Sequence, residues 1–290
     1  MRSSDRIQEK RMEIQRIKEI PPLPLVGQRL LISLNNEDTT VDEITGIIAQ
    51  DPALVARLLG LANSAFFGRS GKIKTIKEAI VRVLGFDMVK SLAFSIVMSG
   101  VFDAKKCRGF DLERYWSTAM FTAVLAGLLS QHLKTKVHSS KQHFYLCGLL
   151  HHLGLLALAH SSPEEMAQVF QAHEADPQRG LASCERDLLG ADHRQAGGWL
   201  ARMWQLPAEV VAVIEHHHDP DYRAEHWEVA LFVGYCEELA KHCIGGTGVF
   251  PESPVAAEVL GISAGDLQTV QSRFQGRFEE IRQVARVIGL

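Results

Sequence analysis

Residues Cys147–His160 read CGLLHHLGLLALAH, an apolar stretch that contains two adjacent histidines, His151 and His152. The stretch predicts a helix over about 142–159. Neighbouring side chains on a helix point about 100° apart. We therefore expect one of the two histidines to face the core and the other to face a groove or solvent.

A second group of histidines, His216, His217 and His218, lies in the stretch EHHHDP at 215–220, where the pattern predicts the end of a helix. Two interpretations are open for both groups. The histidines are either hydrogen-bonded structural residues, favoured at a helix end by the negative end of its dipole, or ligands of a metal ion. We prefer the structural interpretation for both groups.

Helical patterns extend over nearly the whole chain. Thr40 with Glu43 has the spacing of a capping box, and Asp51 followed by Pro52 is typical of a helix start. Further helices are predicted at about 5–20, 111–133, 163–175, 180–188, 192–204, 207–217, 226–243 and 264–288. Alternating strand patterns and hairpin turns are essentially absent, so the predicted fold class is all-α.

The composition is that of a soluble globular protein, with 46% hydrophobic and 22% charged residues and a net charge of -3. This charge gives no reason to expect a nucleic-acid partner. No run of 18 uninterrupted apolar residues predicts a membrane span, and the charged N-terminus is unlike a signal peptide. Five cysteines without CxxC spacing favour reduced thiols and hence a cytoplasmic protein.

Several stretches together resemble one family. These are QDPALVARLLGLANSAFFG (50–68), TIKEAIVRVLG (75–85), LCGLLHHLGLLAL (146–158) and ERDLLGADHRQAGGWLARMWQLPAEVVAVIEHHHDP (185–220). Their order and spacing are similar to the HDOD family, the HD-related output domain of bacterial signalling proteins, within the HD/HD-GYP-like superfamily. The resemblance covers roughly residues 18–243.

The resemblance implies a multi-helical HD-like domain preceded by an N-terminal helical subdomain. It divides the chain into a linker or docking helix at 1–20, an N-terminal helical half at 21–110, an HD-like helical half at 111–243 and a C-terminal helical extension at 244–290. These boundaries are expectations that follow from the family pattern.

The resemblance also implies a test of the histidines, because HD-type phosphohydrolases bind one or two divalent metals with histidines and aspartates. Onto the positions of that pattern fall Thr118 for the first histidine, His151 and His152 for the His-Asp pair, His193 for a later histidine, His217 and His218 for a His-His pair, and Glu237 for the final aspartate. Two ligands of the pattern are therefore replaced, one by threonine and one by a second imidazole.

These replacements weaken the binding of a hard metal such as Mg²⁺ or Mn²⁺, which prefers oxygen ligands. We therefore expect no catalytic residue, no bound cofactor and no metal. If a divalent transition metal such as Zn, Ni, Fe or Mn is nevertheless held, the candidate ligands are His151, His152, His193, His217 and His218.

The resulting hypothesis is a non-enzymatic signal-transduction or response-regulator output module that acts through protein–protein contacts. The expected partners are other signalling proteins, including an upstream receiver or sensor domain, or a second copy in a homodimer. Two alternatives stay open: a metal-dependent phosphohydrolase acting on cyclic dinucleotides, and a module that senses a nucleotide without cleaving it.

Overall fold

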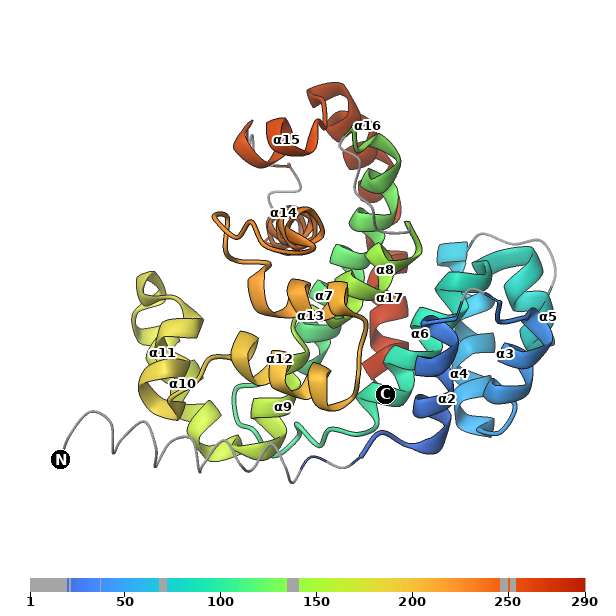
Figure 1. The fold of residues 1–290 in the computed structure, drawn as a ribbon, viewed down its shortest axis with the longest axis horizontal. Coiled ribbons are helices and arrows are strands. Elements are labelled where there is room, and N and C mark those ends of the chain that lie inside the picture. Colours follow the sequence, from blue (N-terminus) through green and yellow to red (C-terminus); the bar gives the residue numbers. More distant parts are fainter. Residues whose placement is uncertain are drawn as a thin grey trace.

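The computed structural model describes residues 20, 22–36, 38–67, 72–134, 141–245, 250 and 254–289 (Figure 1). Every regular element in these ranges is helical and none is a strand, which confirms the all-α prediction. The amphipathic helix expected at 5–20 falls, apart from its last residue, outside the described residues.

The described residues of the predicted N-terminal helical half, 21–110, form a group of short helices at one end of the molecule, called the first half below (Figure 1). They are α2 (Leu25–Leu34), α3 (Val41–Ile48), α4 (Pro52–Ala62), α5 (Ile76–Ala79) and α6 (Phe86–Ser99), with a 3₁₀ turn at Ala65–Phe67 and a π-helical turn at Ile80–Leu84. Helix α6 packs on α2 and also on α8 (Lys141–Leu150), so it joins the two parts of the molecule.

Local signals define where these helices begin. Thr40 and Glu43 form the predicted capping box, in which each side chain accepts the backbone N–H of the other residue. Asp51 accepts two backbone N–H groups at the start of α4, with Pro52 at the first helical position. Both predictions are confirmed. Each cap satisfies backbone donors that the helix itself leaves free.

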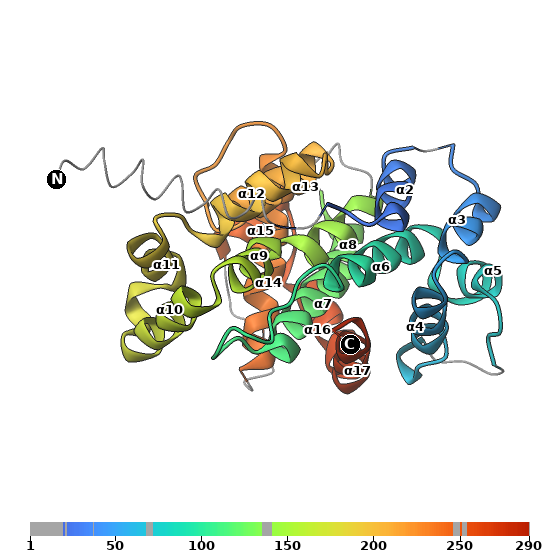
Figure 2. The same cartoon turned by 90° about the horizontal axis from the view of Figure 1, so that it is seen from below.

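The described residues of the predicted HD-like helical half, 111–243, form a larger helical body, called the second half below. Its helices are α7 (Leu112–Leu129), α8 (Lys141–Leu150), α9 (Leu153–Ser161), α10 (Pro163–Ala175), α11 (Leu181–Leu189), α12 (His193–Met203), α13 (Ala208–His216) and α14 (Trp227–Ile244), with 3₁₀ turns at Ser130–His132 and Pro177–Arg179. Helix α7 packs against α8 and α14, while α12 packs against α9 and α13. Helices α10 and α11 project at the end opposite the first half (Figure 2).

The last part of the chain forms α15 (Pro254–Leu260), α16 (Ala264–Gln275) and α17 (Phe278–Gly289). The single helix predicted at 264–288 is therefore wrong in its middle, where a turn separates α16 from α17. Helix α17 contacts α7 in the second half and α4 and α6 in the first half (Figure 1). The C-terminal helix thus packs against both halves.

The continuous helix predicted over 142–159 is also wrong in its middle. Helix α8 ends at Leu150 and α9 begins at Leu153, so His151 and His152 lie at the turn between them. The two imidazoles lie side by side there, with ring centroids 4.1 Å apart. Both residues are buried, at 0% and 8% exposure, so the expectation that one faces a groove or solvent is wrong.

Glycines allow the helices around this turn to approach closely. A Cβ atom on Gly154 of α9 would overlap the backbone carbonyl of His193 at the start of α12. A Cβ atom on Gly234 of α14 would overlap the backbone carbonyl of His217 at the end of α13. Any larger residue at these positions would separate helix ends that carry histidines.

The stretch His143–Ser161 is long and apolar enough to be compared with a membrane span. It is broken at the two histidines, and 83% of its most apolar window is buried inside the protein. Core helices of globular domains have the same properties.

We expect Gly154→Ala to lower the free energy of unfolding by at least about 2 kcal/mol, because the added methyl group collides with backbone atoms that cannot rotate away. Urea denaturation followed by circular dichroism measures this change. The matched control is Gly127→Ala in α7, where a Cβ atom meets nothing within 4 Å. The control should be neutral or more stable by about 0.5–1 kcal/mol, and equal stability of the two variants would contradict the close approach.

Candidate metal centre

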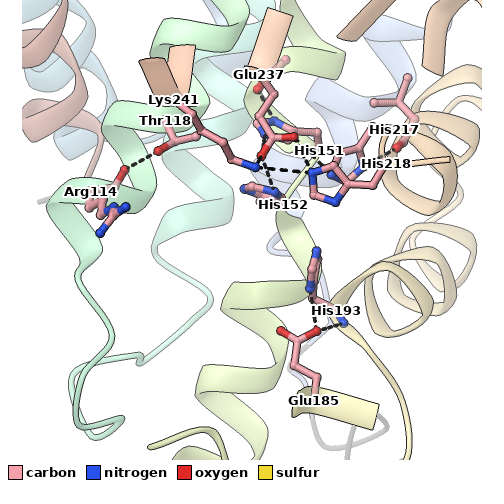
Figure 3. A network of polar contacts seen from close by, with 12 residues as sticks. Arg114, Thr118, His151, His152, Glu185, His193, His217, His218, Glu237 and Lys241 are labelled. Atoms are coloured by element: carbon pink, nitrogen blue, oxygen red, sulfur yellow. Dashed lines mark hydrogen bonds and ion pairs between the residues drawn. The ribbon is translucent and has the colours of Figure 1, made fainter. Parts of the chain in front are cut away.

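The carboxylate of Glu237, on α14, lies at the centre of a buried polar cluster (Figure 3). His152 Nε2 lies 3.0 Å from Glu237 Oε1, and His218 Nε2 lies 2.7 Å from Glu237 Oε2. The two imidazoles come from the α8–α9 turn and from the residues after α13. Three separate segments therefore converge on one carboxylate.

Two further imidazoles face the same carboxylate from slightly farther away. His151 Nε2 lies 3.9 Å from Glu237 Oε1, and His217 Nε2 lies 3.7 Å from Glu237 Oε2. On the other side of each ring, Nδ1 donates to a backbone carbonyl, that of Gly148 at 2.7 Å and that of Val213 at 2.8 Å. A neutral imidazole that donates through Nδ1 carries its lone pair on Nε2, so both lone pairs point into the cluster.

His193 lies beside the cluster, with its ring centroid 5.5 Å from that of His152 (Figure 3). Glu185 of α11 accepts both its backbone N–H, at 2.8 Å, and its Nδ1–H, at 2.6 Å. Its Nε2 is buried and has no hydrogen-bond partner among the described atoms. The carboxylate of Glu185 thus fixes the ring with its Nε2 lone pair free, as metal-bound histidines are commonly held.

Lys241 supplies a cation that the sequence analysis did not foresee. Its Nζ lies 2.5 Å from Glu237 Oε1 and 3.5 Å from His218 Nε2 (Figure 3). Lys241 stands one helical turn after Glu237 on α14, and Glu and Lys four residues apart commonly pair on a helix. That spacing is visible in the sequence, where ELAK follows Glu237, but it does not show that the carboxylate is buried.

Burial and charge together set the protonation states of the cluster. Desolvation lowers the pKa of His151 to about 4, despite the nearby carboxylate of Glu237. Desolvation also lowers the pKa of His152 and of His217 well below the usual range. Burial opposes ionisation of Glu237, but His152, His218 and Lys241 outweigh it and hold the pKa of Glu237 well below its ordinary value. The neutral imidazoles of His151, His152 and His217 thus surround one charged carboxylate.

The donor atoms fit a single metal ion of intermediate softness. Ligand atoms of His152, His217, His218 and Glu237 all lie within 4.8 Å of one another. Three imidazoles and one carboxylate are a ligand set suited to Zn²⁺ and other transition metals rather than to Mg²⁺. The unpaired Nε2 of His217 is already free to coordinate. Binding through His152 and His218 would displace the hydrogen bonds that they now make to Glu237.

The other predicted positions are divided by the structure. His151 and His193 lie against the four-residue group but outside it. Thr118, on α7, stands outside it as well, and its hydroxyl donates to the backbone carbonyl of Arg114 at 2.9 Å. The structure brings the five histidines and Glu237 near one another, whereas Lys241 and Glu185 were missed.

Comparison with known proteins gives a consistent assignment. Residues 20–220 match the HDOD domain family. An uncharacterized protein of Treponema pallidum (strain Nichols) is 30% identical over 271 residues, which cover 91% of this chain and 50% of that protein. The chain therefore spans about half the length of this curated relative.

Two solved structures share the fold. A protein of Marinobacter aquaeolei VT8 named "Putative signal transduction protein" superposes with a TM-score of 0.84 at 24% identity, over 98% of this chain and 66% of that chain. A protein of Shewanella amazonensis SB2B named "Putative phosphohydrolase" superposes with a TM-score of 0.75 at 26% identity, over 94% of this chain and 97% of that chain. The arrangement of helices is thus shared with proteins of both descriptions.

We expect Glu237→Gln to lower the free energy of unfolding by about 2 kcal/mol, because a neutral amide cannot accept the charge-assisted hydrogen bonds that hold three segments together. Thermal and urea denaturation measure the loss. Glu238→Gln, at the exposed neighbouring position, is the matched control and should change the stability by less than about 0.5 kcal/mol. A Glu237→Gln protein as stable as the control would show that the carboxylate is not a structural centre.

We expect the protein to lose stability as the pH falls from 6.5 towards 4. The unfolded chain protonates His151 near pH 6.5, whereas the folded chain keeps it neutral down to about pH 4. In this window the unfolded state binds more protons, so the free energy of unfolding rises with pH and levels off above 6.5.

Urea denaturation at a series of pH values tests this expectation. In His151→Gln the slope of unfolding free energy against pH should decrease by up to about 1.4 kcal/mol per pH unit, the contribution of one proton. An unchanged slope would mean that His151 titrates in the folded protein as it does in the unfolded chain.

Proposed function

This chain belongs to the HDOD domain family, and we propose that it is a signal-transduction module that acts through contacts with other proteins and does not hydrolyse phosphodiesters. HDOD domains are related to the HD phosphohydrolases, so the absence of hydrolysis has to be argued from the centre itself. The observation that carries the proposal is that Glu237, the one carboxylate of the four-residue group, is already bound by His152, His218 and Lys241.

Charge is the first reason. HD-type hydrolysis uses carboxylates to neutralise the metal ions and to activate water. Here His152 stands where the family pattern has an aspartate, and it brings no negative charge. At about 4 Å and an effective dielectric constant of about 20, one charge pair is worth about 4 kcal/mol, or roughly a thousandfold in affinity. A hard dication such as Mn²⁺ would be held correspondingly more weakly.

The resident cation is the second reason. The ammonium of Lys241 occupies one oxygen of Glu237 and also approaches His218. A dication at the four-residue group would have to enter beside this positive charge or displace it. The negative charge of Glu237 is thereby balanced by Lys241 without a metal ion, as expected of a centre that supports structure.

Exposed apolar side chains support a role in protein contacts. Leu25 and Ile32 of α2 are 60% and 67% exposed, and Met203 at the end of α12 is 47% exposed. Ile32 and Met203 line one groove, together with Ile20, the first residue that the structure describes. Exposed apolar side chains that gather at one groove are typical of interaction surfaces. A receiver or sensor domain joined to the chain before Ile20 would lie close enough to bind this groove.

A metal-dependent phosphohydrolase is the second candidate, because the four ligand atoms are close enough for one ion. In that case the purified protein would contain near-stoichiometric Mn or Fe, and its activity would depend on the cluster. Zn or Ni without turnover would instead fit a structural ion.

The decisive experiment is a hydrolysis assay on the purified protein with added Mn²⁺. A cyclic dinucleotide and a chromogenic phosphodiester serve as substrates, and elemental analysis gives the metal content. We expect turnover no higher than that of His151→Ala, because neither protein has the carboxylates that hydrolysis needs. Turnover that His151→Ala abolishes would refute the proposal and establish the second candidate.

A further inference from the structure

A cavity of about 690 Å³ lies between α7, the end of α14 and α17. Its volume is in the range of pockets that bind small molecules, about 300–1,000 Å³. In Figure 1 these three helices lie in the central part of the molecule, and α17 belongs to the C-terminal segment beyond the residues that match the family. Lys241 is the one residue of the cavity that also contacts Glu237 in the histidine cluster.

The cavity is lined by an excess of positive charge. Four cations, Arg114, Lys241, Arg282 and Arg286, face two carboxylates, Asp111 and Glu113. The chain as a whole carries a net charge of -3, so this local excess runs against the overall balance. A cationic cavity in an anionic protein attracts and retains anions.

Two of the arginines share a single carboxylate oxygen. Arg286 Nη2 lies 2.8 Å and Arg282 Nη2 lies 3.2 Å from the same atom, Glu113 Oε1. Each guanidinium has five N–H donors in a planar fork, so one shared oxygen leaves most of them for another acceptor. Arg114 of α7, which also lines the cavity, makes no ion pair with any described carboxylate.

Ser117 provides a buried polar group at the same place. It lines the cavity, is 5% exposed, and its Oγ has no hydrogen-bond partner among the described atoms. A buried hydroxyl without a partner is unfavourable, so a small movement of this wall that let Ser117 meet a polar ligand atom would be favourable. Phe278 and Ile244 add apolar surface to the lining.

We propose that this cavity binds a small organic phosphate. Arginine forks, a lysine and a hydroxyl are the groups that recognise a phosphate, and the apolar lining requires a carbon-containing part. The cavity is too large for inorganic phosphate alone. The proposal deepens the proposed function, because the ligand is an input that the module senses and not a substrate that it cleaves.

Lys241 connects the cavity to the histidine cluster. Its side chain lines the cavity while its ammonium pairs with Glu237. A bound phosphate would compete with Glu237 for this ammonium. Ligand binding would thus change the hydrogen bonding of Glu237, which joins the turn between α8 and α9 to the end of α13.

Isothermal titration calorimetry at low ionic strength tests the site. The probes are adenosine 5′-monophosphate, glucose 6-phosphate and inorganic phosphate, so that an aromatic and a sugar ester are compared with the bare ion. We expect at least one ester to bind more tightly than inorganic phosphate. Arg114→Gln should weaken this binding about tenfold or more, as loss of a charge-assisted hydrogen bond does.

Glu113→Gln should change the affinity in the opposite direction. An increase in affinity cannot be explained by partial unfolding of the variant. Removing this carboxylate releases Arg282 and Arg286, so the ester should bind several-fold more tightly. Arg273→Gln, at an exposed arginine of α16 that does not line the cavity, is the matched control and should leave the affinity unchanged.

Three results would overturn the proposal. The first is that no ester binds at millimolar concentration, and the second is that neither Arg114→Gln nor Glu113→Gln changes the affinity. The third is that inorganic phosphate binds as tightly as the esters, which would indicate an adventitious ion only. The hydrolysis assay is independent of all three. Failure of ligand binding therefore leaves the non-hydrolytic module standing, and turnover would refute that module whatever the cavity binds.

Discussion

The carboxylate of Glu237 is the constraint on which the centre of this protein depends. A charge that is 1% exposed is costly unless several donors compensate it. His152, His218 and Lys241 do so from the α8–α9 turn, from the residues after α13 and from α14 itself. Each of these segments must be held in place for the charge to be tolerated, so the electrostatic requirement fixes the relative positions of the helix ends.

Packing satisfies that requirement by bringing backbones unusually close. Gly154 lets α9 touch the start of α12, and Gly234 lets α14 touch the end of α13. Both contacts are made at the backbone of a cluster histidine, His193 in the first case and His217 in the second. The absence of two side chains therefore contributes as much to the geometry of the cluster as the presence of the imidazoles.

Much of this organisation can be predicted from the sequence, for physical reasons that differ between elements. Helix starts such as the one at Thr40 follow from local hydrogen bonds and can be read directly. The convergence of His151, His193 and His217 required the family pattern, because nothing local brings distant residues together. The break at His151 and His152 was missed, since leucine and alanine on both sides favour a continuous helix and only tertiary contacts interrupt it. Lys241 was missed because its pairing matters only when the carboxylate of Glu237 is buried, and that burial depends on which face of α14 packs inward.

The chemistry of the centre follows from where its positive charge comes from. A metal ion can dissociate, and while it is bound it activates a water molecule. A lysine ammonium is covalently part of the chain and does not activate water in this way. Glu237 pairs with the lysine, and burial keeps the imidazoles of His151 and His217 neutral. The same lysine also lines the cationic cavity beside α17. In a fold shared with a protein named as a putative phosphohydrolase, Lys241 thus pairs with the carboxylate of the histidine cluster, and under our proposal the same side chain responds to a bound anion.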